Sequence, residues 1–386
     1  MPAQPHARGE GEERVTALEL FFDLIFVFAL TQVAGLVSAS PTWEGLAQGV
    51  LVLGMLWWAW AAYAWLTNTL DPEDGAVRLT MFGAMAAMFV ASLAVPHVFG
   101  DDALLFACAY AVVRIAHLAL YVVAGLGDRD LLGAIGRLAV GSATGITLLF
   151  VASAVDGWLQ LSLWAVALSA DLLGAYIGGG RGWRLSPGHF AERHALVLII
   201  ALGESIVALG VGASESDLGL GVLAAVLLGL AVACALWWAY FDVVAIVAER
   251  KLKETTGKAQ LTMARDSYSY LHLPMVAGIV LFAVGVKKTL AHVGEPLELV
   301  PAVTLCGGVA LYLVAHVLFR LRNVRTLSRQ RVVVAVLLCL TIPVAVEIPA
   351  LATLSLVAAL CAALIGYEAI RFSEARAGVR HAPKHA

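Results

Sequence analysis

Residues 17–38 read ALELFFDLIFVFALTQVAGLVS, an apolar run that contains only two charged side chains. A helix that crosses a bilayer needs about 20 mostly apolar residues, because lipid offers no hydrogen-bond partner to the backbone. Similar runs recur along the chain, which is 61% hydrophobic and only 14% charged over 386 residues. Soluble domains carry about 25% charged residues. The sequence therefore predicts an all-α, polytopic integral membrane protein, and it excludes a soluble enzyme, a disordered scaffold and a coiled coil.

The apolar runs predict about twelve transmembrane helices. We place them at 17–38, 44–66, 77–98, 103–124, 131–152, 158–178, 189–212, 219–247, 268–288, 298–319, 331–349 and 350–372. The last two are separated only by the turn at Pro349, so they are the least distinct pair. Gly141 and Gly145 give the fifth run a small-xxx-small face, which favours close contact with a neighbouring helix.

The two halves of the chain resemble each other in several places, in the same order. LWWAW at 56–60 matches LWWAY at 236–240, and the Ala-His pair at 116–117 matches the pair at 315–316. We therefore expect a duplicated six-helix unit. Because six is even, both copies would enter the membrane in the same direction, as a parallel 6+6 repeat. The predicted boundaries are a cytoplasmic tail (1–16), a first repeat (17–178), a linker (179–188), a second repeat (189–372) and a cytoplasmic tail (373–386).

Lysine and arginine predict the orientation. If the N-terminus is cytoplasmic, nearly all of the 25 basic residues lie on that side, and the opposite side holds only Lys287 and Lys288. The positive-inside rule therefore places both termini and the linker in the cytoplasm. The run at 17–38 follows an acidic segment and has no small-residue cleavage site, so we expect it to remain as a membrane helix rather than act as a secretory signal.

Charge and cysteine content exclude several other classes. The net charge of −3 leaves no basic domain for nucleic acid. All five cysteines lie in apolar runs without metal-ligand spacing, so we expect buried free thiols and neither a metal nor a cofactor. These cysteines are Cys108, Cys234, Cys306, Cys339 and Cys361. The expected partners are the lipid bilayer and a small solute or ion, and a homo-oligomer is compatible with the sequence.

Three motifs resemble one bacterial family. ELFFDLIFVFALTQV (19–33), HFAERHALVLIIALGESIVALG (189–210) and YSYLHLPMVAGIVLFAVG (268–285) are similar to the low temperature requirement A (LtrA) family. The resemblance implies a multi-pass protein of the bacterial inner membrane that is linked to growth in the cold. It implies no agreed biochemical activity.

The candidate functional residues are polar groups inside the predicted helices, where a charge costs about 2.5–3.5 kcal/mol and needs a partner or a function. Glu19 and Asp23 are one turn apart and could bind a cation or share a proton. The structural alternative is that they pair with arginines such as Arg137 or Arg193.

The seventh run carries Arg193 and Glu204 only about 20° apart around the helix. Glu204 is either a protonatable or substrate-contacting acid or half of a structural ion pair. Arg114, deep in the fourth run, also needs a carboxylate. We expect Glu204 to pair with Arg114 at the centre of the bundle, with Asp171 as the next candidate.

Histidines add groups that titrate near neutrality. His117, His316 and His272 could move protons, although hydrogen bonding between helices is the simpler interpretation. Asp242 closes the WWAYFD motif, whose tryptophans are more typical of packing than of a stacking site. The full set of candidate solute- or ion-binding residues is Glu19, Asp23, Arg114, His117, Asp171, Glu192, Arg193, His194, Glu204, Asp242, His272 and His316.

These features favour a secondary transporter or permeation protein for a proton, a small cation or a small solute. A membrane-embedded enzyme or lipid-handling protein, and a structural or sensory protein without turnover, remain alternatives. Enzymatic activity is less favoured because the sequence has no serine elbow, phosphate-binding loop, HExxH or Rossmann motif.

Overall fold

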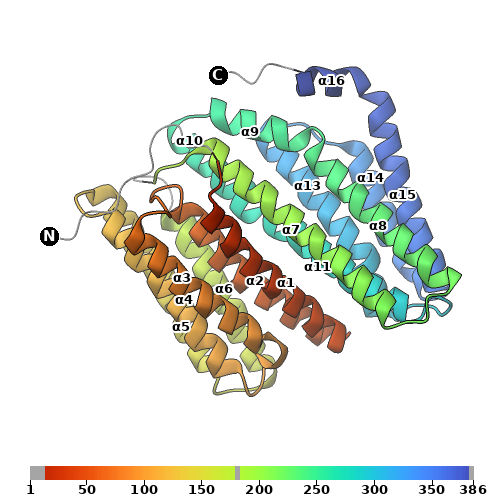
Figure 1. Ribbon diagram of the computed structural model, residues 1–386, viewed down its shortest axis with the longest axis horizontal. Coiled ribbons are helices and arrows are strands. Elements are labelled where there is room, and N and C mark those ends of the chain that lie inside the picture. Colours follow the sequence, from red (N-terminus) through yellow and green to blue (C-terminus); the bar gives the residue numbers. More distant parts are fainter. Residues whose placement is uncertain (1–13, 179–182, 382–386) are drawn as a thin grey trace. The chain divides into compact units, whose positions relative to one another are not determined.

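The computed structural model describes residues 14–178 and 183–381, which form helices joined by short connections and no β-strand (Figure 1). The all-α prediction is therefore confirmed. By their packing, the described residues divide into two compact units. Unit 1 consists of residues up to 36, 44–193 and 256–265, and unit 2 consists of residues 37–43, 194–255 and 266 onward. The predicted 6+6 repeat and its boundaries stay a prediction.

Unit 1 contains the N-terminal helices. They are α1 (Ala17–Ala39), α2 (Trp43–Leu66), α3 (Gly75–Ala94), the 3-10 turn η1 (Val95–His97), α4 (Ala103–Ala124), α5 (Arg129–Ala152), α6 (Gly157–Gly178) and the start of α7 (Pro187–Ser214), together with α10 (Gly257–Met263). Helix α3 packs on α4, α4 on α5 and α5 on α6. A Cβ atom on Gly141 would lie 2.8 Å from the carbonyl oxygen of Ala170 in α6. This close approach confirms the predicted small-xxx-small face.

Unit 2 contains the remainder of α7 and the C-terminal helices. These are α8 (Leu220–Phe241), α9 (Val244–Glu254), most of the π-helical turn η2 (Ala264–Tyr270), α11 (His272–Ala291), α12 (Leu299–Ala302), the π-helical turn η3 (Val303–Gly307), α13 (Gly308–Val324), α14 (Arg329–Ala345), α15 (Ala350–Arg371) and α16 (Ser373–His381). Helix α11 packs on α13, α13 on α14, α14 on α15, and α15 on α8.

The structure corrects the predicted number of long membrane helices. Eleven helical segments among the described residues are long and apolar enough to cross a membrane. The run at 331–349 forms α14, which has 17 residues and contains Pro343. At 1.5 Å per residue this helix spans about 25 Å, less than the hydrocarbon thickness of about 30 Å. The sequence prediction missed this because the run continues through the turn at 346–349.

Large apolar side chains cover the outer faces of both units. Leu220 is 87% exposed and Ile370 is 82% exposed. Exposing such large apolar side chains is unfavourable in water but not in lipid. The chain is thus a multi-pass membrane protein. All five cysteines are free, as predicted, but only Cys306 and Cys361 are buried. The other three lie on outer helix faces, where the apolar pattern alone could not separate lipid contact from burial.

Candidate functional site

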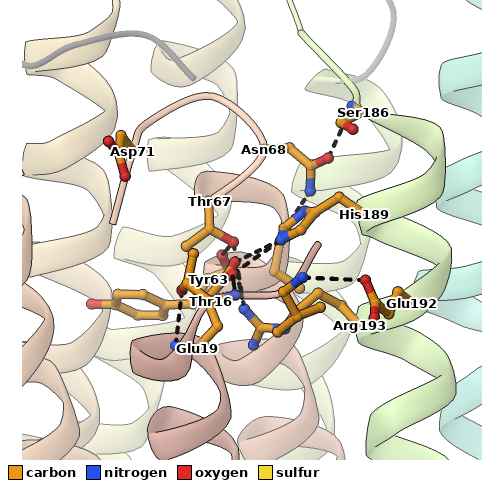
Figure 2. Close-up of polar contacts among 12 residues, drawn as sticks. Thr16, Glu19, Tyr63, Thr67, Asn68, Asp71, Ser186, His189, Glu192 and Arg193 are labelled. Atoms are coloured by element: carbon orange, nitrogen blue, oxygen red, sulfur yellow. Dashed lines mark hydrogen bonds and ion pairs between the residues drawn. The ribbon is translucent and has the colours of Figure 1, made fainter. Parts of the chain in front are cut away.

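Two of the sequence motifs meet in unit 1, where α1 and the start of α7 bury four charged or titratable side chains, of which Figure 2 labels Glu19, His189 and Arg193. Nη1 of Arg193 lies 3.0 Å from Oε1 of Glu19, and Nη2 lies 2.7 Å from Oδ1 of Asp23. The side chains of all three residues are fully buried. Arg193 is therefore the arginine partner that the sequence left open. We call Glu19, Asp23, His189 and Arg193 the acidic cluster.

The local sequence explains why Glu19 points into the cluster. Thr16 precedes the first residue of α1, and its hydroxyl accepts a hydrogen bond from the backbone N–H of Glu19 at 3.3 Å. In return, Oε2 of Glu19 accepts from the backbone N–H of Thr16 at 2.8 Å. This reciprocal pair is a capping box, which satisfies two N–H groups at the helix start. It fixes the carboxylate of Glu19 at the helix terminus.

His189 completes the surroundings of Glu19. Its Nε2 lies 2.9 Å from Oε1 of Glu19 (Figure 2). A carboxylate only accepts hydrogen bonds, so Nε2 carries the proton in this contact. The start of α7 is held in place because the N–H of Ser186 donates to Oδ1 of Asn68 at 2.9 Å, and Pro187 then opens the helix.

Asp23 is less completely bonded than Glu19. Its Oδ1 accepts from Nε1 of Trp60 at 2.8 Å as well as from Arg193. Its Oδ2 is buried and has no hydrogen-bond partner in the part of the chain that the structure describes. A buried oxygen without a donor is costly, so this atom is where a proton or a small cation would be most stabilised.

The charges of the acidic cluster do not balance when both acids are ionised and His189 is neutral. Two carboxylates face one guanidinium, which is always protonated. A net negative charge in a buried site is unfavourable, and one added proton neutralises it. The cluster is therefore neutral when it holds one proton in addition to those of the guanidinium, either on a carboxylate or on His189.

A second charged group in unit 1 centres on Arg114, which is fully buried in α4. Its Nη2 lies 2.8 Å from Oδ1 of Asp171 in α6, and it also donates to the hydroxyl of Ser142 in α5. Asp171 accepts further hydrogen bonds from Ser142 and from the hydroxyl of Tyr110, each at 2.9 Å. The carboxylate paired with Arg114 is thus Asp171, the second of the two partners that the sequence offered, rather than the Glu204 that we favoured.

His117 lies one helical turn beyond Arg114. Its ring centroid is 4.9 Å from that of Tyr121, edge to face, and 5.6 Å from that of Tyr63. His117 is thus packed against two tyrosine rings.

The second and third motifs meet in unit 2 around His272, which is fully buried. Its Nδ1 is 3.0 Å from the carbonyl oxygen of Ser267 and must therefore be the donor. Its Nε2, 2.9 Å from the hydroxyl of Tyr240, must then accept the tyrosine proton. The rings of His194 and Tyr268 lie against His272 at centroid distances of 5.3 Å. This arrangement satisfies a neutral imidazole on both sides.

Unit 2 also buries Arg331, and all three nitrogens of its guanidinium group form hydrogen bonds. Arg331 donates from Nε and Nη2 to the two oxygens of Glu368, at 2.8 and 2.7 Å. Its Nη1 donates to the carbonyl oxygen of Ala239 at 3.1 Å and lies against the ring of His316. Such a two-pronged pair is geometrically specific and strongly stabilising once formed.

Asp242 is bound by the C-terminal helix. The guanidinium groups of Arg376 and Arg380 in α16 both pair with its carboxylate. A cavity of about 340 Å³ lies beneath α16, with Trp238, Arg320 and Glu368 in its wall. Asp242 therefore fastens α16 rather than presenting a free carboxylate.

Two candidates lie outside these groups. Glu192 is exposed, and its Oε2 accepts from the N–H of Val15 at 3.2 Å. Glu204 is buried in unit 2, with 3% of its surface exposed, and remains a candidate on burial alone. In the described ranges, no three histidine, cysteine or acidic side chains are grouped so that they could hold a metal ion.

Sequence reasoning missed several residues that complete these groups. Trp60 was interpreted as packing, although its indole N–H bonds Asp23. Ser142 lies within the small-residue face GSATG, and its hydroxyl is a signal that this face has a polar function. The Arg331–Glu368 pair was missed because Arg331 was counted only among the basic residues that predict the orientation.

Comparisons with known proteins agree with the motifs. The family model described as bacterial low temperature requirement A protein (LtrA) matches residues 14–366. A protein of Rhizobium meliloti (strain 1021), described only as uncharacterized, is 33% identical over 288 residues, which cover 71% of this chain and 69% of that protein. No solved structure matches significantly. The chain therefore belongs to the bacterial low temperature requirement A (LtrA) family.

Proposed function

We propose that this LtrA-family protein is a proton-coupled secondary transporter, and that the acidic cluster is its proton site. The observation that carries the proposal is the unbalanced charge of Glu19, Asp23 and Arg193, combined with the unbonded Oδ2 of Asp23. Intramembrane ionisable groups of this kind are typical of proton and ion pathways.

A proton fits the cluster better than a metal cation. Ca²⁺ and Mg²⁺ take six or more oxygen ligands, whereas only one carboxylate oxygen of Asp23 is unbonded. Nη2 of Arg193 also lies 2.7 Å from the other oxygen of Asp23 and would repel a bound cation. Protonation of Oδ2 instead removes the excess negative charge without any rearrangement.

The packing of each unit supports the proposed duplication into parallel six-helix repeats. In unit 1, the contacts run from α3 to α4, α5 and α6; in unit 2 they run from α11 to α13, α14 and α15. His117 lies in the second helix of the first series, and His316 lies in the second helix of the other. The two series thus share one order of contacts and one histidine position.

Hydrogen bonds in unit 2 support α14 as the twelfth crossing in spite of its length. The N–H groups of Ala350 and Leu351 donate to the carbonyl oxygens of Glu295 and Val293, and that of Leu297 donates to Ala345. The turn after α14 thus joins the loop after α11, while α14 begins near the basic end of α13. With twelve crossings and the distribution of basic residues, we place both termini in the cytoplasm of the bacterial inner membrane.

Proton flux into proteoliposomes, followed with an enclosed pH-sensitive dye, tests the function. The wild-type protein should carry a proton flux that empty vesicles lack, and Asp23→Asn should abolish it. Glu192→Gln is the matched control, because this acid lies on α7 beside Arg193 but is exposed. Equal flux from Asp23→Asn and wild type, or none above empty vesicles under any imposed gradient, would contradict the proposal.

Cysteine labelling tests the orientation separately. In a cysteine-free background, a membrane-impermeant reagent added outside should label position 215 and miss position 258. The reverse pattern would place the termini outside.

A further inference from the structure

Unit 1 contains a cavity of about 80 Å³ that the acidic cluster does not use. Its walls are aromatic: Trp58 and Trp65 from α2, Tyr121 from α4 and Trp183 from the segment before α7. Arg114 and His117 also line it. Three indole rings around a small space are typical of sites for flat ligands, because aromatic faces stack at low entropic cost.

Arg114 faces this cavity with unused hydrogen-bond donors. Its Nη2 is occupied by Asp171 and Ser142, whereas Nε and Nη1 form no hydrogen bond in the described part of the chain. The residue is 0% exposed. A buried guanidinium with idle N–H groups is unfavourable unless something in the cavity accepts from them.

Two further polar groups line the same space. The imidazole of His117 and the hydroxyl of Tyr121 are buried, and neither forms a hydrogen bond of normal geometry. His117 interacts with the backbone of Ala62, and the hydroxyl of Tyr121 interacts with the side chain of Thr69. A ligand with several acceptor atoms would therefore meet donors on three side chains at once.

The polar side chains that line the cavity determine whether it suits an anionic or a cationic ligand. Among the residues that the structure describes, no carboxylate lines the cavity, whereas Arg265 lines it in addition to Arg114. The guanidinium of Arg265 lies 4.3 Å from the ring centroid of Tyr176 and donates to the Tyr176 carbonyl oxygen at 3.1 Å. These guanidinium groups offer hydrogen-bond donors to an anion, whereas the described lining has no carboxylate that would pair an amine.

We propose that this cavity binds a small planar organic monoanion, with its carboxylate on Arg114 and its ring among the tryptophans. Guanidinium hydrogen-bonds carboxylate in a directional manner, and Nε and Nη1, which lie on different edges of the group, each provide a separate donor for it. That this anion is the substrate of the transporter rests on the proposed function. Binding of the anion in the cavity does not require transport.

Benzoate is the probe for this site. Isothermal titration of the full-length protein in nanodiscs should give saturable benzoate binding at millimolar concentration or below. Benzamide, the neutral isostere, and benzylamine, the cation, should bind much more weakly because they lack the charge that Arg114 pairs. Cyclohexanecarboxylate should bind more weakly than benzoate, because it keeps the charge and loses stacking.

Two variants locate the site. Arg114→Gln should weaken benzoate binding by about tenfold or more, as expected when a hydrogen bond to a charged group is lost. Ala62→Leu should do so by filling the cavity, without changing any charge. Their matched controls are Arg129→Gln and Ala143→Leu, both on exposed positions of α5. If Arg114→Gln fails to fold, Ala62→Leu still tests the site. Size-exclusion chromatography and the helical circular dichroism signal would show that Ala62→Leu is folded.

The outcomes separate the two proposals. No benzoate binding to wild type, binding equal for benzoate and benzamide, or binding unaffected by Ala62→Leu would each overturn the assignment of this site. Benzoate binding that is lost in Ala62→Leu, in a protein with no proton flux, would support the site and overturn the transport function instead.

Discussion

Each unit buries an arginine that pairs with an acid of its last long helix. The two arginines differ in how many of their nitrogens are hydrogen-bonded. In unit 2, all three nitrogens of Arg331 are bonded, two of them to Glu368. In unit 1, only Nη2 of Arg114 is bonded among the described residues; Nε and Nη1 have no hydrogen-bond partner there, and the residue lines a cavity. A saturated arginine holds helices together, whereas one with idle donors is available to a ligand. Both of the sites that we propose therefore lie in unit 1.

The same contrast holds for the titratable clusters. Unit 2 groups a histidine with tyrosines, and each nitrogen of His272 already has a partner. Unit 1 places two carboxylates against one arginine and leaves an oxygen of Asp23 unbonded. Only the second arrangement gains from the addition of a proton.

The largest stability effect is expected at Arg331. Arg331→Gln removes the charge paired with the buried Glu368, which then keeps only the hydrogen bond from Nε2 of Gln330 among those described, and should lower the free energy of unfolding by about 3–5 kcal/mol. Thermal denaturation in detergent would measure it. The double variant Arg331→Gln/Glu368→Gln should recover much of the loss, and additive losses in this cycle would show that the pair is not coupled.

Arg114→Gln should be less damaging than Arg331→Gln. Asp171 would keep hydrogen bonds from Ser142 and Tyr110, so the expected loss is about 1–3 kcal/mol. The same denaturation assay compares the two variants directly. An equal or greater loss at Arg114 would reverse the distinction drawn here between the units.

Tyr240→Phe removes the hydroxyl that donates to His272 while keeping the ring. The buried imidazole nitrogen is then left without a donor, at an expected cost of about 1–2 kcal/mol. Proton flux should be unchanged, because the acidic cluster lies in unit 1. Loss of flux with full stability would assign this histidine group a function of its own.

The smallest effect is expected at Arg380. Its side chain is 44% exposed, and Asp242 retains Arg376, so Arg380→Gln should cost less than about 1 kcal/mol. Limited proteolysis of α16 should be nearly unchanged. Rapid cleavage within α16 would show that this contact alone fastens the helix.

Much of the fold was predictable because apolar length is a strong signal in lipid, and only α14 was too short for the predicted length. The partnership of Glu19 and Asp23 with Arg193 was also within reach, since all three lie in apolar runs and need partners. The choice of Asp171 over Glu204 for Arg114 was not within reach, because both acids lie inside apolar runs and only packing decides between them. Trp60 and Glu368 were missed because indole and helix-end carboxylate groups have ordinary roles in most membrane helices.

The most direct test of the central claim is the protonation state of Asp23. Infrared difference spectra recorded as the pH is lowered should show a protonated-carboxyl C=O band in the wild-type protein and in Glu192→Gln. That band should be missing from Asp23→Asn, because the cluster then has only Glu19, which is ionised against Arg193 and His189. An identical band in Asp23→Asn and wild type would contradict the assignment of the exchangeable proton to this cluster.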